Sequence, residues 1–209
     1  MSFLKKNYRM AHEFFRKYLR GRFLIAWAVF LLLNVGAYAV MAANMDAAQQ
    51  IMAQFAEMLE GMNIDFENGG RTALMLLLNN GRSTLSSMLM GLIPYAFLPA
   101  LTLLVNGAVI GAVLAVAASA GRPVGRLVLY GLLPHGVFEI SALMIGVAGG
   151  LWLCADITAL VRRRDGAMPL ERALPALLRV FLCYALPLLI IAALTEAFVT
   201  PALTTRFLG

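Results

Sequence analysis

A histidine and a glutamate stand four residues apart in a part of the chain that is otherwise apolar. Residues Leu133–Glu139 read L-P-H-G-V-F-E, and the apolar run around them extends from Leu127 to Cys154. Residues four apart on a helix share one face, so His135 and Glu139 would form a polar face within a membrane helix. A charged side chain costs about 2.5 to 3.5 kcal/mol at the bilayer centre on insertion scales. We therefore expect this face to point into a bundle, toward a partner or into a wet cavity.

Three kinds of chemistry fit this polar face. It could be a hydrogen-bonded lock that sets how helices pack, a proton or solute pathway, or part of a metal site. A metal such as zinc needs three or four protein ligands, and His135 and Glu139 supply two. The other histidine, His12, belongs to the basic N-terminal segment, so a further ligand would be Glu196, Asp156, an asparagine or a residue of a second copy. We expect no cofactor unless it is zinc.

Further polar residues lie in apolar segments and need partners there. Amide side chains in lipid commonly hydrogen-bond across helix interfaces. Arg82 would pair with Glu139 or Glu196, or extend its long side chain to the membrane interface. With His135 and Glu139, these residues form the expected polar intramembrane cluster: Asn79, Asn80, Arg82, Asn106 and Glu196.

Composition places the chain among polytopic membrane proteins. Of 209 residues, 61% are hydrophobic and 13% are charged, which is outside the range of soluble globular domains. The sequence lacks the common phosphate-loop, zinc-protease, C-x-x-C and nucleophile-elbow motifs, so we expect a protein that is not an enzyme. The two cysteines, Cys154 and Cys183, lie in or at apolar runs and are expected to be small buried residues rather than a disulfide.

Charge distribution predicts the orientation. Seven of the 17 basic residues precede the first apolar run, where Glu13 is the only acidic residue. By the positive-inside rule the N-terminus is cytoplasmic, in the cytoplasmic (inner) membrane of a prokaryote. Residues 1–22 are expected to form a basic amphipathic segment on the membrane surface, contacting lipids. A signal peptide is disfavoured because the first apolar run is long enough to span.

The remainder, residues 23–209, is expected to be a single all-α transmembrane bundle of about five spans. The segment 72–121 is too long for one span and contains Pro94 and Pro99, which predicts a turn there. The alternative is one long kinked helix that begins at Thr84, with a re-entrant segment after Asn106. The spans are predicted near residues 23–43, 72–93, 96–119, 127–154 and 174–199, with a cytoplasmic loop at 156–173.

The extracytoplasmic loop at 44–70 shows helical periodicity. Ile51, Phe55 and Met58 recur on one helix face, which indicates an amphipathic helix. Two interpretations fit this helix. It packs on the outer surface of its own bundle, or it is a docking platform for an envelope protein.

Small residues in the apolar runs indicate close helix packing. Gly107 with Gly111, and Gly146 with Gly150, are two G-x-x-x-G spacings that allow two backbones to approach. They predict either packing inside the bundle or a homodimer. Pro134 suits the first turn of a helix, and Gly136 would leave room for a neighbouring backbone.

The order and spacing of three motifs resemble the stage II sporulation protein M family. These motifs are N-G-A-V-I-G at Asn106–Gly111, L-L-P-H-G-V-F-E-I-S-A at Leu132–Ala142 and G-V-A-G-G-L at Gly146–Leu151. The pair Asn79–Asn80 is similar to paired asparagines of that family. The residues that the resemblance assigns to the shared core of the fold are Asn106, Gly107, Pro134, His135, Gly136 and Glu139.

The resemblance implies a membrane scaffold. Family members in spore-forming bacteria gather peptidoglycan-degrading enzymes on the outer face of the membrane during engulfment, and relatives also occur in organisms that do not sporulate. We therefore expect envelope or peptidoglycan-remodelling proteins as partners, and no nucleic acid. A small transporter or channel subunit with a His/Glu site is the alternative, and an intramembrane metalloenzyme is a third hypothesis.

Overall fold

The computed structural model describes residues 3–61 and 68–208, and this part of the chain is helical without any β-strand. The all-α prediction is therefore confirmed. The long helices are α1 (Phe3–Phe14), α2 (Arg20–Ala43), α3 (Met45–Gly61), α4 (Gly69–Leu89), α5 (Leu101–Ser119), α7 (Leu133–Val161), α8 (Leu170–Val180), α9 (Leu186–Leu194) and α10 (Thr200–Leu208). The short elements are the 3-10 turns η2 (Met90–Leu92) and η3 (Leu98–Ala100), the helix α6 (Val124–Arg126) and the π-helical turns η1 (Phe15–Leu19), η4 (Leu127–Leu132), η5 (Phe181–Ala185) and η6 (Thr195–Val199).

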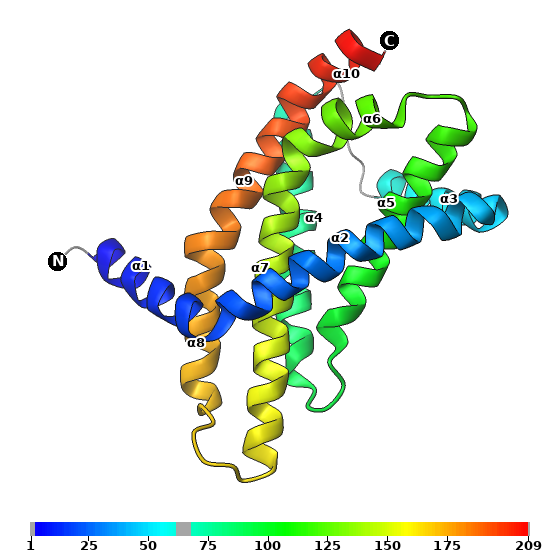
Figure 1. Cartoon of the computed structure of the whole chain (residues 1–209). Helices are drawn as coiled ribbons and strands as arrows, with labels where there is room; N and C mark the ends of the chain where they lie inside the picture. Colours follow the sequence, from blue (N-terminus) through cyan, green and yellow to red (C-terminus); the bar gives the residue numbers. More distant parts are fainter. Residues whose placement is uncertain (1–2, 62–67, 209) are drawn as a thin grey trace.

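Two groups of helices make up the bundle (Figure 1). Helix α7 packs against α4 and against α9, which also contact each other. The second group consists of α5 with α2 and α3, and α2 joins the two groups by crossing α7. The chain from α8 to α10 is one nearly continuous helix that runs antiparallel to α7.

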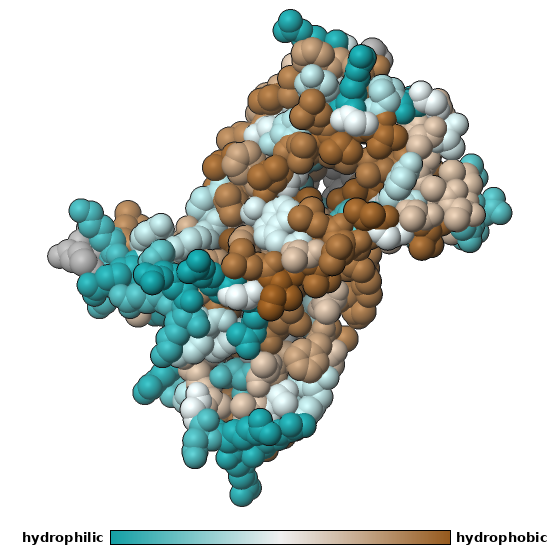
Figure 2. All heavy atoms as spheres, in the orientation of Figure 1, coloured by the Kyte–Doolittle hydropathy of each residue, from teal (hydrophilic) through white to brown (hydrophobic). Residues whose placement is uncertain are grey.

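Four helical segments of the described chain are long and apolar enough to cross a membrane, which confirms a membrane-embedded bundle. They are Phe3–Ala43, Leu98–Ser119, Val124–Val161 and Leu170–Leu208. The remaining predicted span, residues 72–93, lies mostly in α4. The polar run of α4 from Asn79 to Thr84 lowers its hydropathy. Figure 2 shows a hydrophobic surface over the middle of the bundle and hydrophilic surface over α1 and the loop between α7 and α8.

The segment between α4 and α5 turns back at its prolines, as the two-span interpretation predicts. Tyr95 and Phe97 adopt positive φ angles of 65° and 46° in this turn. The Tyr95 N–H donates to Thr158 Oγ1 at 3.1 Å, so the turn is attached to the end of α7. The alternative is wrong, because α4 runs unbroken through Asn80 and α5 runs unbroken through Asn106.

Glycines allow α4 and α7 to touch at the level of the backbone. A β-carbon at Gly146 would lie 2.6 Å from the Thr84 carbonyl oxygen, and one at Gly150 would collide with the Ser87 carbonyl oxygen. Across the same contact, a β-carbon at Gly91 would collide with the Gly150 carbonyl oxygen. We call these contacts the α4–α7 glycine seam.

The second G-x-x-x-G pair serves the contact between α2 and α5. A β-carbon at Gly111 would lie 2.7 Å from Ala37, whereas one at Gly107 would be in ordinary contact with Leu33. Both glycine pairs are thus used for packing within the chain. The space predicted beside Gly136 holds no neighbouring backbone, because a β-carbon there would meet only Ile140 of the same helix, at 3.8 Å.

Helix α1 packs one face on the bundle and leaves the other exposed. The Tyr8 ring stacks on Tyr184 with centroids 5.7 Å apart, and the Phe14 ring meets Trp152 edge-on at 4.9 Å. Phe3 and Leu4, at the start of the helix, are exposed. Helix α1 thus has one buried and one exposed face, and its place on the membrane surface stays a prediction.

Helix α3 occupies the predicted extracytoplasmic loop and packs against α5. Ala48 is fully buried against Ala112 and Ala115, and Ile51 packs beside them. Of the three residues assigned to docking, Ile51 and Phe55 are half-buried and Met58 is 47% exposed. The helix therefore packs on its own bundle and keeps Met58 accessible.

The glycine seam generates a prediction about stability. Gly146→Ala should lower the free energy of unfolding by about 1 to 3 kcal/mol, because the added methyl group overpacks the contact with α4. The matched control is Gly36→Ala on α2, where a β-carbon meets nothing within 4 Å. Unfolding in mixed detergent micelles, followed by circular dichroism, would measure both variants. Equal stability of Gly146→Ala and Gly36→Ala would contradict the seam.

Candidate functional site

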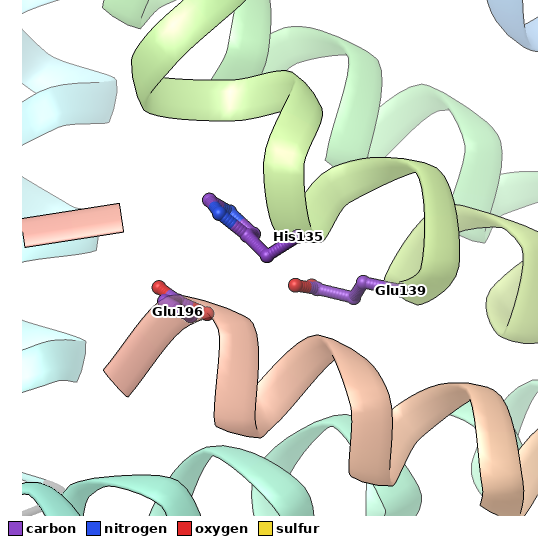
Figure 3. Close-up of side chains that lie close together, drawn as sticks. All are labelled: His135, Glu139 and Glu196. Carbon is purple, nitrogen blue, oxygen red and sulfur yellow. The ribbon is translucent and has the colours of Figure 1, made fainter. Parts of the chain in front are cut away.

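Three ionisable side chains from two segments meet inside the bundle. His135 and Glu139 come from α7, and Glu196 comes from η6 (Figure 3). One ligand atom from each residue lies within 4.8 Å of those of the other two, and all three side chains are half-buried. We call this group the His–Glu–Glu cluster. It joins the two residues of the polar face to Glu196, a candidate further ligand from the sequence.

Prolines and π-helical turns place these side chains. Each of Pro134, Pro187 and Pro201 follows a π-helical turn, η4, η5 or η6. A proline ring clashes with the carbonyl group one turn earlier, and a widened turn relieves that clash. Pro134 lies in the first turn of α7, as predicted, directly before His135. Two of the three widened turns therefore adjoin or contain a residue of the cluster.

A threonine fixes the state of the histidine. His135 Nδ1 lies 3.2 Å from Thr200 Oγ1, and the Thr200 hydroxyl donates to the Thr195 carbonyl oxygen at 3.3 Å. Because the hydroxyl proton is engaged, Thr200 accepts a hydrogen bond from Nδ1–H. A neutral His135 then carries its lone pair on Nε2. In this tautomer Nε2 is the ring nitrogen that could bind a ligand.

Two asparagines of α4 complete the surroundings. The side chain of Asn80 is within hydrogen-bonding reach of the Glu139 carboxylate. Asn79 Nδ2 donates to Asn80 Oδ1 at 3.3 Å, so the amide group of Asn80 is left to donate toward Glu139. Asn79 and Asn80 therefore link α4 to the cluster, as the sequence-based expectation placed them.

The structure does not bring Asn106 and Arg82 into this cluster, although both were expected there. Asn106 lies on α5 and donates to Thr102 of its own helix at 2.8 Å. Arg82 is exposed on α4, and among the described residues no salt bridge joins it to Glu139 or Glu196. Helix α5 packs against α2 and α3, and Arg82 is on an exposed face of α4, so neither side chain joins the cluster.

Asp156, another candidate ligand, has a separate role. Its carboxylate accepts from the Met168 N–H at 3.0 and 3.2 Å and so holds the loop between α7 and α8. Thr200 was missed by the sequence analysis. It follows Glu196 by four residues, and this helical spacing is the signal that could have found it.

Along the helices, the cluster lies nearer to one end of the bundle. At 1.5 Å rise per residue, His135 is about 13 Å along its helix from Arg126, and Glu196 is about 15 Å from Arg206. Glu139 is about 34 Å from Arg162 at the other end of α7. With the predicted orientation, the shorter path leads to the extracytoplasmic side.

Comparison with known proteins assigns the chain to a family. A family model described as Stage II sporulation protein M matches residues 24–201. The chain belongs to the stage II sporulation protein M family. It is also similar to an uncharacterized protein of the archaeon Methanocaldococcus jannaschii, with 27% identity over 132 residues that cover 63% of this chain and 73% of the relative. No solved structure matches the chain.

The stage II sporulation protein M match covers the whole His–Glu–Glu cluster. It includes α4, α7 and η6, and therefore also both sides of the glycine seam. The resemblance deduced from three motifs near residues 106–151 is thereby confirmed and extended to most of the chain. This membership and the apolar helices establish a membrane protein.

The hydrogen bond to His135 generates a prediction. Thr200→Val should destabilise the protein by about 1 kcal/mol, because Nδ1–H loses its acceptor in a half-buried site. Thr204→Val is the matched control, since the Thr204 hydroxyl bonds only within its own exposed turn. Chemical unfolding in mixed micelles would compare the two. A Thr204→Val effect as large as that of Thr200→Val would show that the contact with His135 adds nothing.

Proposed function

We propose that this stage II sporulation protein M family member is a non-enzymatic scaffold of the prokaryotic cytoplasmic membrane that gathers envelope proteins, with peptidoglycan-remodelling enzymes as the expected class. The observation that carries the proposal is the placement of α3. This helix is held on α5 through Ala48 and Ile51, and it presents Met58 outward. A helix fixed to the bundle at one face and open at the other suits the display of a docking surface.

The way the bundle is packed supports a scaffold. Backbone contacts at Gly146, Gly150 and Gly111 leave α4, α7, α2 and α5 little freedom to slide past one another. A scaffold needs such a fixed frame, because partners bound at separate places must keep a set spacing. The polar contacts of Asn80, Glu139 and Thr200 are directional, so they also help to fix the positions of the helices.

The docking role of α3 predicts a selective loss of partners. Met58→Asp should reduce recovery of peptidoglycan-remodelling enzymes by at least about tenfold after cross-linking in membranes, because it places a charge on the contact surface. Quantitative mass spectrometry of the purified complexes would measure recovery. Thermal unfolding should be unchanged, since Met58 is exposed.

Two controls make this experiment decisive. Gln50→Asp places the same charge on α3 at another exposed position and should leave recovery intact. Ile51→Asp should instead unfold the contact with Ala112 and Ala115. Unchanged enzyme recovery with Met58→Asp would count against α3 as the docking surface.

A second candidate function follows from the His–Glu–Glu cluster. Ionisable residues at membrane depth commonly mark ion or proton pathways, and this cluster is half-buried. A small transporter or channel subunit would use Glu139 and His135 as its polar site. Helix α5 runs unbroken through Asn106, so the structure contains no re-entrant segment there to support this candidate.

Flux measurements distinguish this candidate from the scaffold. In proteoliposomes, Glu139→Gln should abolish ion or proton flux and leave expression intact if the cluster is a pathway. The control is Glu171→Gln, which alters an exposed glutamate of α8. Collapse of Glu139→Gln expression, or wild-type protein without flux above empty liposomes, would exclude the transporter.

A further inference from the structure

Two carboxylates lie close together in an apolar part of the bundle, and no arginine or lysine of the described residues pairs with either. Glu139 and Glu196 belong to one cluster within 4.8 Å, and no salt bridge to either is found among the described residues. Arg82 is exposed elsewhere on α4. Two negative charges at this distance repel strongly where water is scarce. A bound cation or bound protons must compensate for that repulsion.

The third member of the cluster favours a metal ion over protons alone. Carboxylate oxygens and an imidazole nitrogen form a donor set that zinc and similar divalent transition metals bind. Around a tetrahedral ion with bonds of about 2.0 to 2.2 Å, neighbouring ligand atoms lie about 3.3 Å apart. The ligand atoms lie within 4.8 Å of one another, so binding such an ion would bring them closer by up to about 1.5 Å.

The hydrogen bonds around the cluster have the form of the outer shell of a metal site. A ligating histidine usually donates its other ring N–H to an acceptor, and ligating carboxylates are themselves hydrogen-bonded. His135 donates through Nδ1 to Thr200, which leaves Nε2 for an ion. Asn80, positioned by Asn79, lies against Glu139. Thr200 and Asn80, which make these two contacts, are not members of the cluster. The contacts therefore do not depend on the charges of the three cluster residues.

We propose that His135, Glu139 and Glu196 bind one divalent transition-metal ion of the zinc class, which fastens η6 to α7. Three protein ligands leave a fourth position to water. The proposal is independent of the scaffold proposal, because it concerns a contact within the chain. It assigns Thr200 as a positioning residue that holds the His135 ring.

Metal titration of the purified full chain tests the site. The protein is prepared in detergent without a histidine tag, stripped with chelator and titrated with Zn²⁺ in competition with a fluorescent chelator. We expect one Zn²⁺ per chain, and a rise in the thermal midpoint with zinc concentration because the ion binds the folded state. Co²⁺ should give the visible absorption of a tetrahedral nitrogen–oxygen site.

Variants assign the ligands. Glu139→Gln, Glu196→Gln and His135→Ala should each weaken Zn²⁺ binding by at least about 100-fold, and Thr200→Val by about 10- to 100-fold. His12→Ala is the control, because His12 is exposed and contacts Tyr184 far from the cluster. It should keep full affinity and the full thermal shift.

Two results would overturn the proposal. One is wild-type protein that binds less than about a tenth of an equivalent of Zn²⁺ and shows no thermal shift, which would mean that protons neutralise the carboxylates. The other is unchanged stoichiometric binding in Glu139→Gln/Glu196→Gln. If single variants fail to fold, the wild-type stoichiometry and the Co²⁺ spectrum still decide. Neither readout involves partner recovery, so failure of the scaffold would leave this result unaffected.

Discussion

The backbone contact between α4 and α7 is the constraint on which the rest of the structure depends. Gly146 and Gly150 let α7 approach the carbonyl groups of Thr84 and Ser87, and no larger residue would allow this distance. The same approach carries Asn80 to the side of Glu139. Helix α9 packs against both α4 and α7, and the turn η6 that carries Glu196 follows it and contacts the same two helices. Packing of the smallest residues thus determines where the most polar residues meet.

The second constraint on the structure comes from prolines inside the helices. In lipid, a backbone carbonyl without a partner is costly, so a proline inside a span needs a local adjustment. Here that adjustment is a π-helical turn before Pro134, Pro187 and Pro201. Such turns shift the register of the side chains that follow. His135 and Glu196 lie close together, from antiparallel helices (Figure 3). The prolines and the polar cluster are therefore parts of one arrangement.

The two candidate functions make different demands on the cluster. A scaffold requires only that the helices stay in place, and an ion that fastens η6 to α7 would serve this purpose. A pathway requires that the same groups change their occupancy during each cycle. Helices α1 and α3 lie at opposite ends of α2 (Figure 1), and neither contributes a residue to the cluster. Interaction surfaces and polar core can therefore be altered separately by mutation.

The sequence by itself determined the fold class, the membrane setting, the turn at Pro94 and Pro99, and the polar face of His135 and Glu139. These features follow from local composition, periodicity and the geometry of proline, which act within a few residues. Its motifs also identified the family. Only the tertiary structure placed Glu196 and Thr200 beside His135 and left Arg82 and Asn106 outside the cluster. Those outcomes depend on which faces of distant helices meet. Packing of small residues along the α4–α7 glycine seam decides which helix faces meet. The helical periodicity of a single segment carries no information about that pairing.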